Sequence, residues 1–200
     1  MSTKPQPIPM AGGPQAKPEE EKSQAQLDYE KGVEALKSQD FGQAANAFHN
    51  ALVEYEQSED KTGIANTFDK LGDICKESQD FEKALSYYEK AYKICEEFDD
   101  MYSLISLEDK RALCHQGLQQ YDAALDLFMD LIDRFEKLRS PGSAVVILLK
   151  IADVYTEAGN LEGAIDAYKT AAAIHSNFSH QRKAQDLLDK ATALEQQLNK

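Results

Sequence analysis

The side chains best suited to metal binding or catalysis are few and scattered along this chain of 200 residues. Histidine and cysteine bind zinc and transition metals, and histidine also serves as a general base. The histidines are His49, His115, His175 and His180. His175 and His180 are five residues apart across an expected helix break, and this spacing is too loose to predict a metal pair. We therefore expect neither a metal nor a cofactor.

The three cysteines form no pattern that indicates a disulfide framework or a zinc site. Cys75, Cys95 and Cys114 are odd in number and include no closely spaced pair. Because cysteine packs as a small hydrophobic residue, we expect buried free thiols. The Gly12-Gly13 pair precedes no strand–helix unit that could bind phosphate. No nucleophile is paired with a base and an orienting group, so we expect no enzymatic activity.

The chain is acidic, and its net charge of −13 lies on residues 23–200, because Lys and Glu balance in residues 1–22. Such a surface repels phosphate backbones, so nucleic acid is excluded as a partner. It would attract a basic segment of another protein, or it serves solubility alone. Residues 1–22 are rich in Pro and Gly and lack the apolar core of a signal peptide. No run approaches the roughly 20 apolar residues of a membrane span, so we expect a cytoplasmic protein without membrane insertion.

Similar residues recur at intervals of 40 along the chain without an insertion. Small residues let two helices approach each other, and the aromatic residue four positions after each recurring alanine fills the space between them. The period therefore predicts four helix-turn-helix units. The recurring columns are Gly32/Gly72/Ala112/Ala152, Phe41/Phe81/Tyr121/Leu161, Ala44/Ala84/Ala124/Ala164, Phe48/Tyr88/Phe128/Tyr168 and Ala51/Ala91/Leu131/Ala171.

Apolar residues within each unit recur at helical spacing, as Phe81, Leu85 and Tyr88 do. Asp40, Asp80 and similar polar residues stand in the turns, where they can accept hydrogen bonds from a helix start. The pattern predicts helices at 23–38, 42–58, 61–78, 82–98, 102–118, 122–139, 142–158 and 162–178. A ninth helix from His180 to about Leu198 is expected to cover the last apolar face. Its apolar side comprises Ala184, Leu187, Leu188, Ala191, Leu194 and Leu198.

The segments Phe68-x2-Leu71-Gly72-x2-Cys75 and Ala84-x3-Tyr88 resemble the tetratricopeptide repeat signature. The 40-residue unit is similar to those of the kinesin light chain and LGN-type subgroup. The resemblance implies an all-α, right-handed α-solenoid of four units with a C-terminal capping helix. The implied domains are a disordered tail at 1–22, units at about 23–60, 61–100, 101–140 and 141–178, and a capping helix at 179–200.

Two units depart from the family pattern, because charged residues stand where large apolar residues are usual. Asp28 with Lys31, and Glu108 with Arg111, form opposite-charge pairs three residues apart. Either these helices are partly solvated or rotated, or the first and third units present charge at a contact surface.

The resemblance also implies a concave groove that binds an extended peptide or helix of another protein. The lysines at 70, 110 and 150 form a ladder along this groove, with carboxylates beside them. These charges either recognise a peptide or pair with one another within the surface. The candidate groove residues are Tyr29, Val33, Asp69, Lys70, Asp73, Asp109, Lys110, Leu113, Leu149, Lys150 and Asp153.

The chaperone-binding members of the family grip a C-terminal carboxylate with a lysine and an asparagine in the first unit. Here Tyr29 and Val33 occupy these positions, so we exclude binding of the acidic tails of Hsp70 and Hsp90. The expected function is that of an adaptor or scaffold that binds a partner protein in its groove. A dedicated chaperone for a secreted or assembling partner, and a self-associating structural scaffold, are the alternatives.

Overall fold

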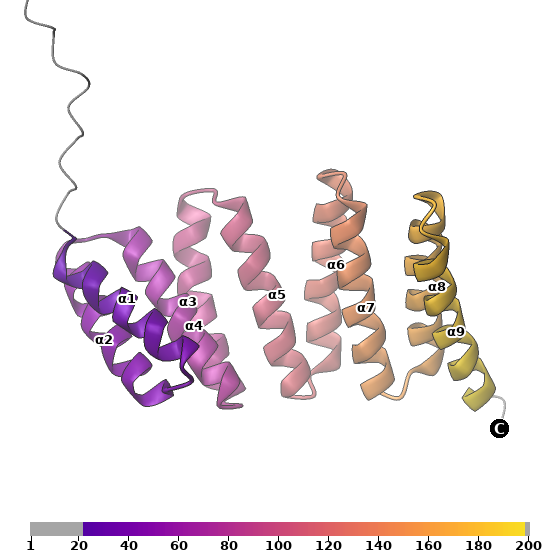
Figure 1. The fold of residues 1–200 in the computed structure, drawn as a ribbon, viewed down its shortest axis with the longest axis horizontal. Helices are drawn as coiled ribbons and strands as arrows, with labels where there is room; N and C mark the ends of the chain where they lie inside the picture. The colour runs from indigo at the N-terminus through magenta and orange to yellow at the C-terminus, as the bar shows by residue number, and fades with distance from the viewer. Residues whose placement is uncertain (1–21, 199–200) are drawn as a thin grey trace, which may run out of the picture.

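A computed structural model describes residues 22–198, which form nine α-helices and contain no strand (Figure 1). The predicted tail therefore lies outside the described residues, except for Lys22. The helices are α1 (Gln24–Lys37), α2 (Phe41–Gln57), α3 (Lys61–Glu77), α4 (Phe81–Glu97), α5 (Met101–Gly117), α6 (Tyr121–Lys137), α7 (Pro141–Glu157), α8 (Leu161–Asn177) and α9 (Gln181–Leu198). The predicted helix bounds are confirmed to within two residues.

Short polar side chains start most of the helices. Asp40 accepts a hydrogen bond from the backbone N–H of Gln43 at 3.0 Å, and Asn160 accepts one from Gly163 at 3.0 Å. Asp60, Asp80 and Asp100 cap α3, α4 and α5 in the same way. Each such cap satisfies one backbone donor that the first turn leaves free. The prediction that Asp and Asn begin these helices is confirmed.

All the turns between consecutive helices share one shape. A residue with positive φ follows each helix; it is glycine at Gly159, with φ of 77°, and is not glycine at the other turns, where φ lies between 51° and 60°. The next backbone N–H then returns to the carbonyl five residues earlier, as from His180 to His175 at 2.9 Å. This turn brings side chains five residues apart together. The non-glycine residues are Gln39, Glu59, Gln79, Asp99, Gln119, Arg139 and Ser179.

Consecutive helices pack against one another along the chain and form an α-solenoid (Figure 1). The columns of small residues allow this packing. A Cβ at Gly32 would meet the ring of Phe48 at 2.7 Å, and one at Gly72 would meet the ring of Tyr88 at 2.5 Å. In the first two units the aromatic residue of the second helix thus occupies the space that the glycine leaves free, as the repeat columns predicted.

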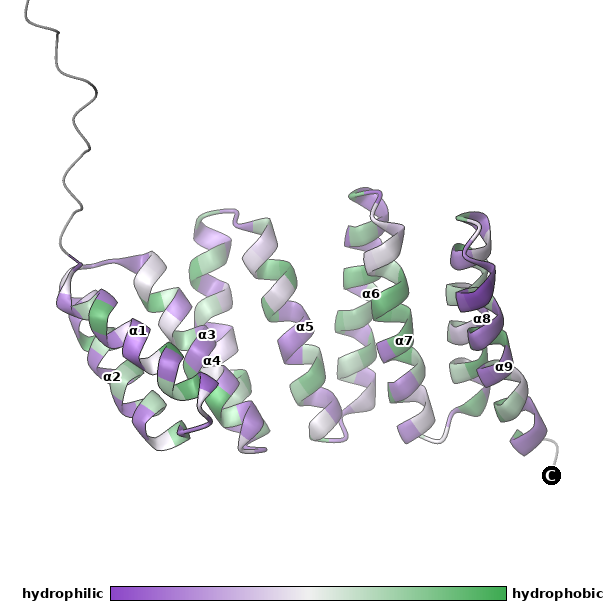
Figure 2. Cartoon of the chain, viewed as in Figure 1, coloured by the Kyte–Doolittle hydropathy of each residue, from purple (hydrophilic) through white to green (hydrophobic). Residues whose placement is uncertain are grey.

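The apolar core is larger toward the C-terminus. One continuous cluster joins buried residues of α5 to α9, whereas α1 to α5 contain three smaller clusters. Figure 2 shows hydrophobic residues concentrated on α6 and α7, while the visible side of α9 is mostly hydrophilic. Because α9 buries Ala184, Leu187 and Ala191, it covers the apolar face of α8. Leu188 and Leu198, which the sequence predicted on the same side, are 38% and 49% exposed and lie outside the buried part of this face.

No helix within residues 22–198 is both long and apolar enough to cross a membrane.

Candidate protein-binding groove

A row of lysines and aspartates crosses α3, α5 and α7. The ammonium nitrogen of Lys110 on α5 lies 2.5 Å from Asp69 Oδ1 and 2.8 Å from Asp73 Oδ1 on α3. Lys150 on α7 likewise lies 2.5 Å from Asp109 Oδ1 on α5. Each lysine therefore bridges to the preceding unit. The sequence left open whether the ladder of lysines recognises a peptide or pairs within the surface. Lys110 and Lys150 are paired within the surface.

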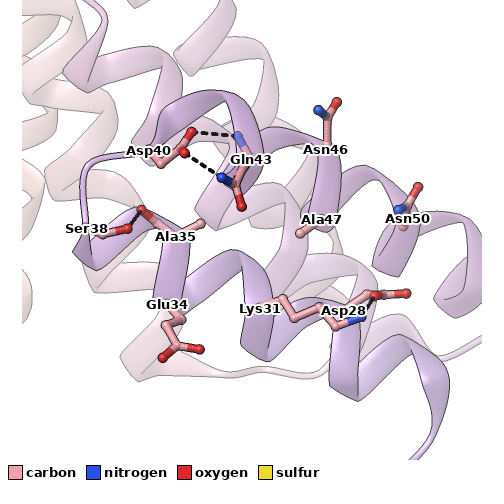
Figure 3. Close-up of a pocket in the computed structure, with 10 residues that line it drawn as sticks. All are labelled: Asp28, Lys31, Glu34, Ala35, Ser38, Asp40, Gln43, Asn46, Ala47 and Asn50. Carbon is pink, nitrogen blue, oxygen red and sulfur yellow. Dashed lines mark hydrogen bonds and ion pairs between the residues drawn. The ribbon is translucent and has the colours of Figure 1, made fainter.

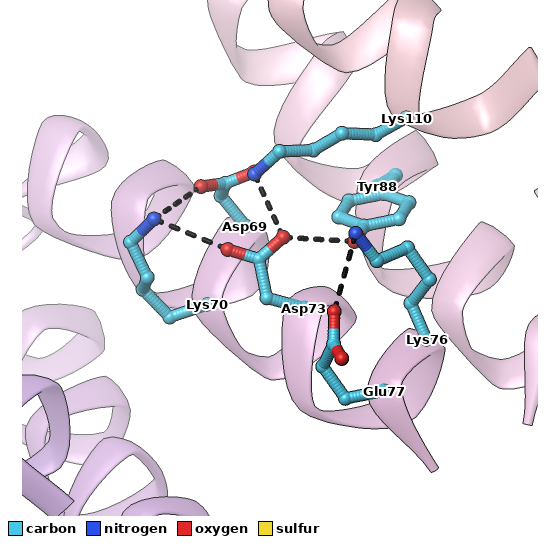
Figure 4. A network of polar contacts seen from close by, with 7 residues as sticks. All are labelled: Asp69, Lys70, Asp73, Lys76, Glu77, Tyr88 and Lys110. Carbon is cyan, nitrogen blue, oxygen red and sulfur yellow. Dashed lines mark hydrogen bonds and ion pairs between the residues drawn. The ribbon is translucent and has the colours of Figure 1, made fainter. Parts of the chain in front are cut away.

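The densest part of this row is a closed network, which we define as Asp69, Lys70, Asp73, Tyr88 and Lys110 (Figure 4). Lys70 lies 3.0 Å from Asp69 Oδ2 and 3.2 Å from Asp73 Oδ2. The Tyr88 hydroxyl donates to Asp73 Oδ1 at 2.9 Å, and the Lys110 ammonium lies 5.4 Å from the centre of the Tyr88 ring. Two lysines thus neutralise two aspartates.

Proton affinities in the closed network reflect these contacts. Burial alone would raise the pKa of Asp73, but hydrogen bonding and the charges of Lys110 and Lys70 outweigh it and lower that pKa. Burial likewise opposes the charge of Lys70, yet Asp69 and Asp73 raise the Lys70 pKa. Burial, together with the Asp73 carboxylate, raises the pKa of Tyr88. Lys70 and Asp73 are therefore charged at neutral pH, and Tyr88 is protonated.

The first unit does not continue the ladder. Tyr29 occupies the position equivalent to Asp69, and its ring packs edge-on against Phe48 with centroids 5.4 Å apart. Val33 is half-buried against the same apolar cluster. Because the residue 41 positions before Lys70 is Tyr29 and not an aspartate, Lys70 pairs with Asp69 and Asp73 of its own helix. These two candidate residues therefore support the core and form the edge of the row.

In the third and fourth units, leucines occupy some positions of this row. Leu113 and Leu149 are half-buried against the large core cluster, and Leu149 replaces the aspartate of earlier units. Asp153 is exposed, with the Tyr168 hydroxyl 3.5 Å from its Oδ1. The row extends to Lys190 on α9, which the sequence interpretation missed. A step of 40 residues from Lys150 would have found it.

Lys190 has no carboxylate within ion-pair distance among residues 22–198. Its ammonium lies 5.5 Å from the centre of the Tyr168 ring, as the Lys110 ammonium lies over Tyr88. We call Leu149, Asp153, Tyr168 and Lys190 the open network, because each stands 80 residues after a member of the closed network. Both networks place an aspartate, a tyrosine and a lysine at equivalent positions. Among residues 22–198, carboxylates neutralise the lysine charge in the closed network but not in the open one.

Two cavities lie beside this row in the C-terminal half. One, of about 230 Å³, lies among α5, α6 and α7 and includes Ile105, Phe135 and Val146. The other, of about 720 Å³, lies among α7, α8 and α9, and Val146 and Leu149 line it as well. Because Val146 lines both, the cavities adjoin and form a largely apolar groove next to Lys150 and Lys190.

A third cavity, of about 520 Å³, lies between α1 and α2 and is mainly polar (Figure 3). Asp28 and Lys31 point toward each other there, with Oδ1 and Nζ 2.8 Å apart, so this predicted pair is confirmed. Hydrogen bonds from Gln24 and then Lys31 lower the pKa of Asp28. Most of its other lining residues are polar as well, so it offers less apolar surface than the C-terminal groove.

The predicted pair between Glu108 and Arg111 is wrong. Glu108 Oε1 instead accepts hydrogen bonds from Tyr92 and Arg134, each at 2.8 Å, while the guanidinium of Arg111 lies 4.9 Å from the centre of the Tyr92 ring. Only 4% of Glu108 is exposed. Its charge is therefore neutralised inside the array by α6, and it is not presented at a contact surface. A partner 26 residues away left no signal in the local sequence pattern.

The turn between α8 and α9 brings together His175 and His180, whose spacing in the sequence did not predict a metal pair. The Nδ1 atoms of His175 and His180 lie 3.4 Å apart, at the edge of the larger cavity. Within the described part of the chain, they belong to no group of three or more residues that could hold a metal ion. Burial, and then the charge of Lys183, lower the pKa of His175.

The cysteines are buried and free, which confirms the prediction for all three. Burial raises the pKa of Cys114 to about 11, so its thiol is protonated and unreactive at neutral pH.

Comparison with solved structures identifies several helical repeat proteins of the same fold. RapI in its apo form aligns with a TM-score of 0.74 and 18% identity over 88% of this chain and 66% of that chain. A putative kinesin light chain repeat protein of Podosopora anserina aligns with a TM-score of 0.67 and 13% identity, covering 88% of this chain and 98% of that one. These identities establish a shared fold and no more.

A Rap protein complexed with Competence and Sporulation Factor aligns with a TM-score of 0.63 and 18% identity, over 88% of this chain. This chain spans half the length of that protein, or 50%. No curated protein sequence matches this chain. The tetratricopeptide repeat family matches residues 23–97 and 103–177, which together make up most of the sequence. With its nine helices in residues 22–198 and its four-fold sequence repeat, the chain belongs to the tetratricopeptide repeat family.

Proposed function

We propose that this chain is a non-catalytic adaptor that binds a peptide or helix of a partner protein in the groove along its odd-numbered helices. The tetratricopeptide repeat fold is generally a protein-interaction module. The observation that carries the proposal is the pair of adjoining cavities along α5, α7 and α9. They leave apolar side chains uncovered beside charged ones, which is the surface that an amphipathic segment requires.

We propose that the binding domain comprises the repeat units at about 23–60, 61–100, 101–140 and 141–178, with the segment 179–200 as a capping helix. The candidate residues contribute unequally. Because Lys110 and Lys150 already hold adjacent units together, their first role is structural. Leu149 lines the larger cavity, whereas Leu113 and Asp153 line neither of the two cavities. Three buried, reduced cysteines are compatible with a reducing compartment, and we propose that the protein acts in the cytoplasm.

Val146 provides the test, because it lines both cavities and is 53% exposed, so an arginine there can extend into solvent. We expect Val146→Arg to abolish partner capture from cells of the source organism while helicity and thermal unfolding are unchanged. Val53→Arg is the matched control, since Val53 on α2 is 51% exposed and lines neither cavity.

A photo-crosslinking residue at position 146 should also link to the captured protein, whereas the same residue at position 53 should not. Equal capture by the Val146→Arg and Val53→Arg variants would show that the groove is not the binding surface. Light scattering tests the self-association alternative: a mass that rises with concentration, and that Val146→Arg returns to the monomer value, would assign the groove to a second copy.

A further inference from the structure

We propose that the cavity among α7, α8 and α9 anchors a partner segment that carries a large apolar side chain next to a carboxylate. This inference rests on the proposed function and names the chemistry of the partner. It arises from the open network, where Lys190, which has no ion pair within residues 22–198, stands at the border of an apolar cavity.

The apolar part of the site is built by three helices. Val145 and Leu149 come from α7, Ile174 from α8 and Leu187 from α9, and Phe178 closes the cavity at the turn. Its volume of about 720 Å³ lies within the range of pockets that hold a compact ligand. Burial of one leucine or phenylalanine side chain there would favour binding, because it removes apolar surface from water.

The carboxylate preference follows from the repeat itself. Lys110 and Lys150 each lie 2.5 Å from the aspartate 41 residues earlier in the chain. The residue 41 positions before Lys190 is Leu149, which cannot pair with it. A partner carboxylate in this place would complete for Lys190 the interaction that the other two lysines make within the array. Lys190 is exposed in the free protein, and a partner that covers it on binding would exclude water and strengthen the pair.

The surroundings of Lys190 also favour a negative group. Lys183, His175 and His180 line the cavity, and Asp186 is the one carboxylate among its lining residues. The imidazole N–H groups can donate hydrogen bonds even when the rings are neutral. These donors of the α8–α9 turn stand about 15 Å along α9 from Lys190, so they would favour a second acidic group of the partner segment.

Charge along the whole chain agrees with this assignment. Asp and Glu outnumber Lys and Arg by 25 to 13 in residues 23–140, but by 7 to 6 in residues 141–200. An acidic segment that is repelled by the first three units meets an almost neutral surface at the last unit and its cap. Charge complementarity of this kind selects partners and steers their approach.

Peptide selection tests the inference directly, because it requires no candidate partner. A random peptide library displayed on phage is selected against the full-length protein, and the enriched peptides are synthesised and titrated against it. We expect them to combine Leu or Phe with Asp or Glu, and to perturb the methyl resonances of Val146 and Leu187. Lys190→Glu should weaken their binding at least about tenfold, since loss of one charge-assisted contact costs about 1.5–3 kcal/mol.

Lys93→Glu is the matched control, because Lys93 is an exposed lysine of α4 for which the described residues show no ion pair. It makes the same change in net charge and should leave the affinity unchanged. Equal loss in both variants, or none in Lys190→Glu, would overturn the inference. Enriched peptides that are basic and perturb α3 and α5 would overturn it as well, while the proposed function would stand.

Failure to enrich any peptide would count against both the inference and the proposed function. Two further occupants are distinguished in the same assay. A synthetic peptide of residues 1–21 that displaces the enriched peptides would identify the N-terminal segment of the chain itself as the occupant. Displacement by excess unlabelled protein, with dimers in light scattering, would identify a second copy. Either result would overturn the assignment to a partner.

Discussion

The closed and open networks occupy equivalent places two units apart, and they differ in residue type at one position. Where α3 carries Asp69, α7 carries Leu149, while each network retains an aspartate, a tyrosine and a lysine. In the closed network Lys110 bridges two carboxylates, whereas Lys190 has no carboxylate within ion-pair distance in the described residues. Equivalent positions of the repeat thus join two units through ion pairs in the middle of the array, and at its end they leave the charge of Lys190 without an ion pair in the described residues.

The difference shows how a repeat protein can separate stability from recognition. Ion pairs between units fix the relative position of α3 and α5, but their charges are already neutralised and offer little to a partner. At α7 to α9 a large apolar core provides the cohesion, which leaves Lys190 available. Because nearest-neighbour interfaces contribute separately to solenoid stability, the two ends can differ without loss of the fold.

Removal of Asp73 should have the largest effect on this contrast. Asp73→Ala leaves the Tyr88 hydroxyl without its acceptor and leaves Lys70 and Lys110 with Asp69 alone, so we expect a loss of about 2 kcal/mol in the free energy of unfolding. The equivalent Asp153→Ala should cost less than about 0.5 kcal/mol, because Asp153 is exposed. Urea denaturation of both variants measures the difference, and equal losses would show that the networks do not differ in cohesion.

Acidification should reduce the difference in unfolding free energy between the wild type and a variant that lacks the Asp73 carboxylate. The folded-state pKa of Asp73 is lowered, so its contribution is complete above the unfolded-state pKa of about 4 and is lost as pH falls through the folded-state value. Asp73→Asn should therefore destabilise the protein strongly at pH 7 and much less near pH 3. Urea melts of the wild type and of this variant at the two pH values test the sign. A gap that grows on acidification would contradict the ionised Asp73.

Removal of the tyrosine hydroxyl should cost more stability in the closed network than in the open one, although the difference is smaller than for the aspartates. Tyr88→Phe removes a hydrogen bond of 2.9 Å to Asp73 and should cost about 1 kcal/mol. Tyr168→Phe removes a weaker contact of 3.5 Å to the exposed Asp153, and its cost should be within about 0.5 kcal/mol of zero. Thermal unfolding of the two variants gives the comparison, and a larger cost at Tyr168 would reverse it.

The new ion pair that converts the open network into a closed one should contribute little free energy, which a double-mutant cycle separates from the cost of replacing the half-buried Leu149. Leu149→Asp gives Lys190 a potential partner in its own chain. A double-mutant cycle with Lys190→Ala should show a coupling of about 0.5–1 kcal/mol between the two positions. The new pair should also remove binding of the selected acidic peptides. Zero coupling would mean that Lys190 cannot reach the position that Lys110 and Lys150 occupy.

The local features of the fold were predictable from residue type and spacing. The 40-residue period identified the repeat, and Asp40, Asp80 and Asn160 marked helix starts that the structure confirms. Gly72 indicated a close approach, which the ring of Tyr88 fills. These features depend on neighbours in the chain or on a fixed offset, so one sequence contains all the information they need.

The candidate groove was only partly predictable. Its columns could be read by alignment of the units, but the pairing of Glu108 with Arg134 and the contact of His175 with His180 could not. The first depends on which of two nearby cations reaches a buried carboxylate. The second depends on a turn in which Ser179 adopts a left-handed conformation that its residue type does not favour.

The sequence by itself determined the repeat, its helices, their caps and the columns of side chains that allow them to stack. The tertiary structure alone decided which charges neutralise one another, because an ion pair depends on distances across units and on burial, which no periodic pattern specifies. Lys110, Lys150 and Lys190 are identical in the repeat, but two of them are bound to aspartates and the third lies beside an apolar cavity.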